Sequence, residues 1–219
     1  MAGLDSSVNN LLGKMRTSTQ TGKGTYGEQA VFKICEEFYQ RDGGILVHSY
    51  SYKVDKSQAG NVKRGDNGKL FIENIGDYTE IDVLYISKFR VFPIEVKAYH
   101  AKEIRIDDAG IYGCYKTDKS PVHQNEMHCR HLYPFMFRAL PRGNTSYICP
   151  IVCMVDKAKI IDERSDWQRD YIKLCVLNTL KRTIEQNNNP LDFQLNIQLC
   201  DQLLKGAMLK SEKYLPPRY

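Results

Sequence analysis

The stretch TEIDVLYISKFRVFPIEVKAYH, residues 79–100, constrains the fold more than any other part of the chain. Two segments rich in Val, Ile, Leu, Phe and Tyr are joined there by the short link SKFR at residues 87–90. Runs of β-branched and aromatic residues on both sides of a short link predict a β-hairpin. Three charged residues stand near the open end of this hairpin, where a plain core hairpin would not need them: Asp82, Glu95 and Lys97.

A symmetric turn centred between Lys88 and Phe89 would fix the register of the two strands. Asp82 would then lie opposite Glu95, with their Cβ atoms roughly 4.5–5.5 Å apart. Period-two alternation puts Glu95 and Lys97 on the same face of their strand. A bulge in either strand would shift this register. The hairpin therefore predicts two carboxylates and one ammonium group at one end of a sheet.

Two carboxylates this close repel each other, so the arrangement is stable only with a cation or a shared proton. Mg²⁺ takes oxygen ligands from one or two carboxylates, together with waters and substrate phosphate. A neighbouring lysine can orient an attacking water or stabilise charge in the transition state. These residue types favour metal-assisted phosphodiester hydrolysis. A surface salt bridge of Lys97 with Asp82 or Glu95 is the alternative that the residues alone leave open.

Asp82, twelve further residues and then Glu95-Val96-Lys97 resemble the active-site signature of the PD-(D/E)XK nuclease superfamily. Further stretches are similar to its nuclease-related domain (NERD) family. These are Gly27-Glu28 at the opening of an amphipathic helix, TEID ahead of the EVK strand, SPVHQNEMHCRHL at residues 120–132, and the strand TSYICPIVCMVD. The resemblance spans about residues 25–160. Ile81 stands where the signature has proline, and the segment 55–78 is longer than this family leads us to expect.

The resemblance implies an α/β fold with a restriction-endonuclease-like mixed β-sheet and helices on both faces. It implies that Asp82 and Glu95 are metal ligands, that the Val96 carbonyl completes the shell, and that Lys97 is the catalytic lysine. It also implies that Glu28 reaches the same site as a further metal ligand or water-bound acid. An ordinary glutamate favouring the helix dipole is the alternative for Glu28.

The resemblance places Gln124 at the substrate edge of the site, in contact with DNA or with Lys97. A solvated helix glutamine is the alternative. Tyr99 and His100 follow the catalytic lysine and are further candidates to lie near the scissile phosphate.

Along the chain, residues 1–24 form a polar, partly helical lead-in, residues 25–186 the nuclease domain, and residues 187–219 a C-terminal helical extension. Apolar periodicity predicts four helices, of which the first begins at Tyr26 and the second at Ser120-Pro121, with a kink or break at Pro134. The third is expected over 167–186 with Trp167 on its inward face, and the fourth over 191–210. Strands are expected at 45–54 and 145–156. This order is typical of a mixed sheet with helices on both sides.

The segment 55–78 is Gly-, Asn- and Lys-rich, and long loops of this kind are often functional or disordered. The net charge of the chain is +5, a mild preference for an anionic partner. Mobile basic residues near the hairpin would contact DNA phosphates without reading sequence. Five candidates for this contact lie in or beside the segment, and a merely solvated loop is the alternative: Lys53, Lys56, Lys63, Arg64 and Lys69.

The histidines and cysteines allow other readings. His128 and His131 stand at i, i+3 on one helix face, but no paired zinc-ligand spacing supports a zinc site, so helix-surface histidines are the favoured reading. The seven cysteines are unpaired in spacing and lie mostly in apolar runs, which indicates a reduced, cytoplasmic protein. No apolar run approaches the roughly 18 residues of a membrane span.

The sequence thus predicts a Mg²⁺- or Mn²⁺-dependent DNA endonuclease or nickase without strong sequence specificity. One centre per chain would cut one strand, so a duplex break would need a homodimer or two events. Two alternatives remain open. One is a non-catalytic nucleic-acid-binding or assembly module, and the other is a nuclease acting on RNA or branched DNA.

Overall fold

The structure is a computed structural model, and the residues that it describes are 6–8, 10–11, 20–53, 62–64, 70–72, 78–99, 101–108, 111–112, 120–156 and 158–219. Only the backbone is described at 20–24, 62–64, 70–72 and 112.

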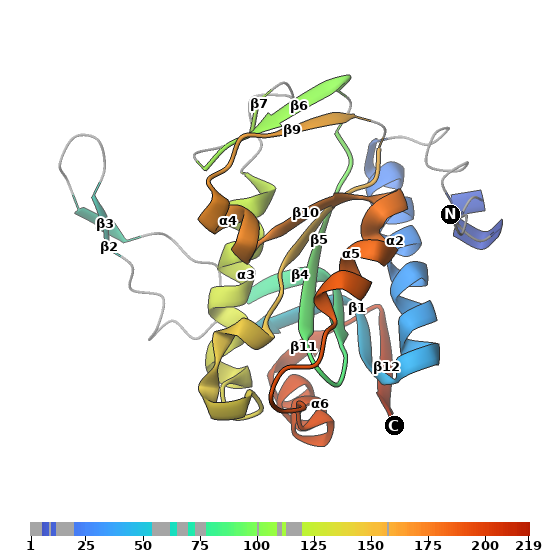
Figure 1. The fold of residues 1–219 in the computed structure, drawn as a ribbon, viewed down its shortest axis with the longest axis vertical. Helices are drawn as coiled ribbons and strands as arrows, with labels where there is room; N and C mark the ends of the chain where they lie inside the picture. The colour runs from blue at the N-terminus through green and yellow to red at the C-terminus, as the bar shows by residue number, and fades with distance from the viewer. Residues whose placement is uncertain are drawn as a thin grey trace.

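A mixed seven-stranded sheet forms the centre of the described chain (Figure 1). Its strands follow the order β10-β8-β5-β4-β1-β11, and β12 also pairs with β1. β5, β8 and β10 run parallel to one another, whereas β4, β1 and the two C-terminal strands join by antiparallel pairing. The bounds are β1 (Gly44–Lys53), β4 (Tyr78–Ile86), β5 (Val91–Lys97), β8 (Ile151–Met154), β10 (Lys173–Val176), β11 (Met208–Lys210) and β12 (Lys213–Arg218).

Helices cover both faces of this sheet. One face packs on α2 (Gln20–Asp42) and α5 (Leu177–Asn187), and the other packs on α3 (Pro121–Met136) and α6 (Ile197–Ala207). α2 and α3 flank opposite sides of the sheet in Figure 1. Side chains of β4 alternate between the two layers, with Val83 and Tyr85 in the α2 layer and Leu84 and Ile86 in the α3 layer. The predicted fold class, a nuclease-like mixed sheet between helices, is confirmed.

Smaller elements complete the described structure. β6 (Glu103–Ile106), β7 (Ile111–Tyr112) and β9 (Lys159–Asp162) form a three-stranded sheet near one end of the main sheet (Figure 1). β2 (Val62–Arg64) pairs with β3 (Leu70–Ile72). Two 3₁₀ turns lie at Pro141–Gly143 and Thr145–Tyr147.

The helix predicted over 167–186 is wrong. This segment contains the end of the short helix α4 (Asp166–Tyr171), then strand β10, then α5. Cys175 is buried where β10 pairs with β8, and this parallel pairing overrides the local helical pattern. Trp167, predicted on an inward face, is 67% exposed because the helix beneath it ends after one and a half turns.

The other predicted helix boundaries hold only in part. α2 begins at Gln20, so Gly27 and Glu28 lie inside the helix and not at its opening. Ser120 caps α3 by accepting a hydrogen bond of 3.5 Å from the His123 amide. α3 then continues past Pro134 to Met136 without the predicted break.

The C-terminal extension was predicted to be helical, and only α6 fits that description. β11 and β12 follow α6 and both pair with β1, so the extension adds strands to the main sheet. The backbone amide of Glu212, between these two strands, donates to the His48 carbonyl at 3.0 Å. The extension therefore reaches the same strand that lies beside the predicted site.

No helix in the part of the chain that the structure describes is long and apolar enough to cross a membrane. Six of the seven cysteines are described, and all six are buried free thiols: Cys35, Cys129, Cys149, Cys153, Cys175 and Cys200.

Candidate active site

The β4–β5 hairpin has the symmetric turn that the sequence predicts. The Ser87 amide donates to the Arg90 carbonyl at 2.9 Å, and the Ser87 hydroxyl accepts from the amides of Phe89 and Arg90. Paired residues run from Ile86 with Val91 to Val83 with Ile94. The regular pairing ends at this step, and Asp82 and Glu95 are the next residue of each strand beyond it.

The alternation of side chains changes phase at Asp82. Ile81 and Val83 are two residues apart, yet Ile81 packs in the α3 layer and Val83 in the α2 layer. The facing strand β1 shows the same change around Ser49, whose φ is +52°. This irregularity takes Asp82 out of the regular pleat, and its Oδ2 accepts a hydrogen bond of 2.7 Å from the Val96 amide.

Glu95 is buried between two cationic or donating side chains. The Lys97 Nζ lies 2.5 Å from Glu95 Oε1, and the His128 Nε2 lies 3.1 Å from Glu95 Oε2. Burial alone would raise the pKa of Glu95. The His128 hydrogen bond and the Lys97 charge outweigh burial and hold that pKa below its usual value.

His128 is a site residue that the sequence reasoning missed. It was predicted to lie on the helix surface, but it is only 5% exposed. Its Nδ1 lies 2.8 Å from the Thr79 hydroxyl, and its carbonyl accepts from the Tyr52 hydroxyl. Because an ionised carboxylate only accepts, the ring donates from Nε2 to Glu95. No sequence pattern signalled the contact between His128 and Glu95, because it depends on how α3 packs on the sheet.

The Asp82 carboxylate is crowded by the negative charges of Glu95 and Glu28, which Lys97 offsets only in part. Burial, followed by the charge of Glu95, raises the pKa of Asp82 well above its usual value, against the opposing hydrogen bond from Val96. The Glu28 charge raises it further. Asp82 is therefore the carboxyl of this pair that takes up a proton first.

Glu28 approaches the site from α2. Gly27 allows this approach, because a Cβ there would meet Val155 Cγ2 at 2.7 Å. Burial and the charges of Glu212, Glu80 and Glu95 raise the pKa of Glu28. The Glu28 Oε2 lies 3.9 Å from His48 Nε2, and the charges of Glu95 and Lys97 also act on Glu28.

The family model of the nuclease-related domain matches residues 23–155, more than half of the chain. The chain belongs to the NERD family. This membership indicates a nuclease-related function and accords with the resemblance seen in the sequence. No curated protein and no solved structure matched the chain.

A NERD nuclease site implies a divalent metal ion, and the donor set fits one. Asp82 and Glu95 offer hard carboxylate oxygens, and the Glu95 charge that raises the pKa of Asp82 is one that a cation would relieve. Among the described residues no three His, Cys, Asp or Glu side chains form a group that could hold a metal ion. The protein would therefore supply few ligands, chiefly the carboxylates of Asp82 and Glu95 with the Val96 carbonyl, and water and phosphate would supply most of the others, as Mg²⁺ commonly requires.

The helix α3 is tied to the main sheet by Asn125. Asn125 is fully buried and donates to the carbonyls of Pro93 (3.2 Å) and Ile151 (2.8 Å), which ties α3 to β5 and β8. Gln124, its neighbour, is half-buried near the start of the same helix. Asn125 thereby fixes the helix that carries both Gln124 and His128.

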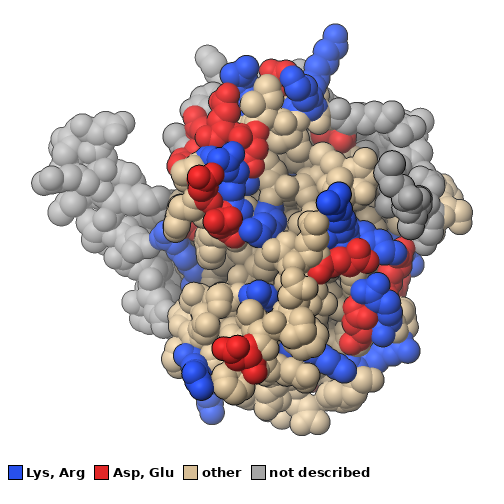
Figure 2. All heavy atoms as spheres, in the orientation of Figure 1, with Lys and Arg blue, Asp and Glu red and all other residues tan. Residues whose placement is uncertain are grey.

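The predicted basic contacts are described only in part. Lys53 ends β1 and is exposed, and Lys63 and Arg64 lie in β2 with only their backbone described. Lys56, Lys69 and His100 lie outside the described residues. Tyr99 is buried at 7% exposure in the core beside β6. On the face in Figure 2, basic and acidic groups lie side by side, so this face of the described structure carries no broad basic patch.

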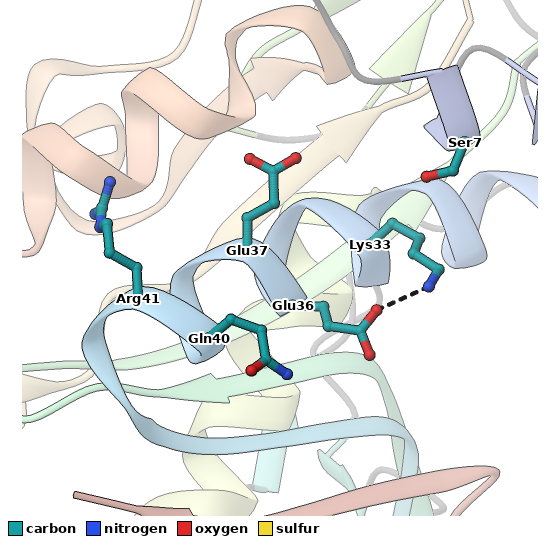
Figure 3. A pocket seen from close by; sticks show the side chains of 6 residues that line it. All are labelled: Ser7, Lys33, Glu36, Glu37, Gln40 and Arg41. Atoms are coloured by element: carbon teal, nitrogen blue, oxygen red, sulfur yellow. Dashed lines mark hydrogen bonds and ion pairs between the residues drawn. The ribbon is translucent and has the colours of Figure 1, made fainter.

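A groove of about 560 Å³ is lined mainly by residues of α2, and Glu28 is not among them (Figure 3). Its charges are largely paired, as Lys33 with Glu36 at 2.8 Å and Lys181 with Glu37 at 2.8 Å. This groove does not include the residues of the candidate site. Its lining residues are Ser7, Lys33, Glu36, Glu37, Gln40 and Arg41.

Proposed function

We propose that this NERD-family chain is a divalent-metal-dependent DNA endonuclease or nickase that hydrolyses phosphodiester bonds. One observation carries the proposal: the Lys97 ammonium lies 2.5 Å from the buried Glu95 carboxylate, beside the charge-crowded Asp82. A lysine and two carboxylates at the splayed end of a hairpin are the groups that metal-assisted hydrolysis needs.

Asp82 and Glu95, with the Val96 carbonyl, would hold Mg²⁺ or Mn²⁺. The bound cation would polarise the scissile phosphate and lower the pKa of an attacking water. Asp82 is held in place by the Val96 amide, and Glu95 by His128. These contacts fix both carboxylates before a cation or substrate arrives, which limits the reorganisation needed for catalysis.

Lys97 would orient the attacking water and stabilise negative charge on the phosphate in the transition state. Its side chain is 26% exposed, so it can reach substrate while it remains paired with Glu95. Glu28 would act as an additional ligand or water-bound acid. Gln124 would contact the DNA or Lys97 at the substrate edge.

The substrate is proposed to be DNA, bound without strong sequence specificity. Lys53, Lys56, Lys63, Arg64 and Lys69 would neutralise backbone phosphates, which carry no sequence information. One centre per chain would nick one strand, and a homodimer or two successive events would break a duplex. The buried free thiols support a reducing, cytoplasmic setting.

A plasmid nicking assay with Mg²⁺ and Mn²⁺ titration tests the proposal. Asp82→Ala and Lys97→Ala should abolish conversion of supercoiled to open-circular DNA, while circular dichroism and melting show an intact fold. Two residues outside the candidate site provide matched controls, the exposed Asp192→Ala and the ion-paired Lys181→Ala, and both should cut like wild type. Cleavage by either site variant at the wild-type rate would refute the assignment.

A non-catalytic binding module predicts binding across all divalent ions without cleavage. A nuclease for RNA or branched DNA predicts faster cutting of those substrates than of duplex. Parallel incubation with single-stranded, duplex, junction and RNA substrates separates these outcomes. The intact set of Asp82, Glu95 and Lys97 favours the catalytic reading.

A further inference from the structure

His48 is a buried polar side chain that the proposed chemistry does not use. The residue is 6% exposed on β1, and its ring packs against Phe32 with centroids 5.2 Å apart. Its Nδ1 lies 3.0 Å from Glu212 Oε2, whereas its Nε2 has no hydrogen-bond partner in the described structure. A buried nitrogen without a hydrogen bond carries a desolvation cost, which a ligand at that atom would remove.

The unpartnered nitrogen points toward a carboxylate. The Glu28 Oε2 is 3.9 Å from His48 Nε2, too far for a hydrogen bond. Two ligands that each lie about 2.1 Å from one ion can be at most about 4.2 Å apart. The separation of these two atoms is therefore within the span of two ligands on a single cation.

The protonation of His48 suits metal binding. The Glu212 Oε2 lies 3.0 Å from Nδ1, and its negative charge favours the tautomer with the proton on Nδ1, so that Nε2 presents its lone pair. The ring is 6% exposed, and burial disfavours a charged imidazole. Carboxylate–histidine pairs of this form orient metal-binding imidazoles in many proteins.

The surrounding charge also favours a cation. The charges of Glu212, Glu80 and Glu95 act on Glu28 and favour a cation there, whereas the charge of Lys97 opposes it. Lys210 lies 3.6 Å from Glu80 and offsets part of that negative charge, and the charge of Lys213 acts on His48 in the same sense. Two of these groups come from the C-terminal extension, Lys210 and Glu212, outside the 23–155 region matched to the NERD family.

We propose that His48 and Glu28 form a second cation subsite, completed by the C-terminal hairpin through Glu212, for a divalent transition-metal ion in preference to Mg²⁺. The imidazole nitrogen sets this preference, because Mg²⁺ selects oxygen ligands. Water supplies the remaining ligands. The inference shares one residue with the proposed function, because Glu28 borders both the proposed nuclease site and the His48 subsite, and it rests on that function in no other way.

Mn²⁺ is the probe, added to the full chain without DNA in excess Mg²⁺ so that the oxygen-only site is filled. Pulsed electron paramagnetic resonance should detect ¹⁴N coupling from a bound imidazole. His48→Phe, which keeps a ring against Phe32, should lose that coupling and weaken Mn²⁺ binding at least tenfold. Glu28→Gln should weaken binding similarly, and Glu212→Gln several-fold, since it acts only by orienting the ring. Melting curves check that each variant folds.

The controls separate this subsite from its neighbours. Asp82→Asn and His128→Gln should retain the ¹⁴N coupling, and so should His123→Phe, which breaks a surface His–Glu pair of 3.7 Å. Absence of ¹⁴N coupling in wild type, its persistence in His48→Phe, or its loss in Asp82→Asn would each overturn the proposal. If wild type fails to nick DNA with any metal while the coupling depends on His48, the subsite stands and the nuclease assignment falls.

Discussion

The Asp82 carboxylate on β4 accepts a hydrogen bond of 2.7 Å from the backbone amide of Val96 on β5. This bond holds the carboxylate next to Glu95, although burial and the Glu95 charge both disfavour its ionised form. A carboxylate buried beside a second carboxylate lowers the stability of the folded state, and proteins keep such groups where function needs the charge.

Asp82→Asn should therefore stabilise the protein while it abolishes cleavage. Because the pKa of Asp82 is raised in the folded state, the folded protein binds the Asp82 proton more tightly than the unfolded chain does. Wild type thus loses stability as pH rises from about 4 through the raised pKa. The asparagine variant lacks this loss, so its advantage should grow with pH and reach about 2–4 °C in melting temperature near pH 8.

The matched control for this stability profile is Asp192→Asn, which changes an exposed loop residue. It should melt like wild type at every pH. If Asp82→Asn melts below wild type at pH 8, or its difference from wild type is the same at pH 4 and pH 8, the inferred crowding of charge around Asp82 is wrong.

His128 should act as a positioning residue for Glu95. Removal of its side chain in His128→Ala takes away a donor 3.1 Å from Glu95 Oε2 and should weaken metal affinity about 10–100-fold. His128→Gln can still donate and should recover part of the loss. Thr79→Val removes the hydroxyl beside Nδ1 with little change in volume and should give a smaller defect.

The measurement is the Mg²⁺ concentration that gives half-maximal nicking, compared with the maximal rate at saturating Mg²⁺. A positioning role predicts that the Mg²⁺ requirement rises more than the maximal rate falls. His123→Gln, at a half-exposed position of the same helix, serves as control and should leave both values unchanged. Equal effects of His128→Ala on both values at reduced melting temperature would indicate a role in folding alone.

Gly27 should be required for the close approach of α2 to the sheet. In Gly27→Ala the new Cβ would meet Val155 Cγ2 at 2.7 Å, and such overpacking costs about 1–3 kcal/mol. Displacement of α2 would also move Glu28 and lower activity. Urea denaturation and the nicking assay measure the two effects.

Gly206→Ala provides the opposite case in a second helix. A Cβ there has nothing within 4 Å, so the substitution should stabilise α6 by about 0.5–1 kcal/mol through helix propensity. If both glycine variants gain stability, the contact of α2 with Val155 is not tight.

The five basic candidates should set the salt dependence of DNA binding. Substitution of Lys53, Lys56, Lys63, Arg64 and Lys69 by glutamine should reduce the slope of log affinity against log salt by about 0.9 for each phosphate that is no longer neutralised. Fluorescence anisotropy in an Asp82→Asn background measures this without cleavage. Glutamine at three ion-paired lysines elsewhere should leave the slope unchanged: Lys159, Lys181 and Lys205. An unchanged slope in the five-residue variant would remove this segment from the DNA interface.

The sequence by itself determined the hairpin, its register and the fold class. Alternating apolar residues and the short SKFR link leave few ways to pair residues 79–86 with 91–97, and a register slip would expose the core face. A different local signal, the Ser120-Pro121 pair, predicted Ser120 as the cap of α3. Local periodicity carries this information because each hairpin strand pairs with its chain neighbour.

Tertiary structure alone decided the contacts between distant segments. Helical spacing could not reveal that residues 173–176 form a strand, because only the buried partner β8 makes that choice favourable. His128 meets Glu95, and Glu212 meets His48, across 33 and 164 residues of chain. The periodicity of the sequence does not predict these two contacts. They form only when a helix and the C-terminal strands pack on the sheet, and local sequence does not specify where they pack.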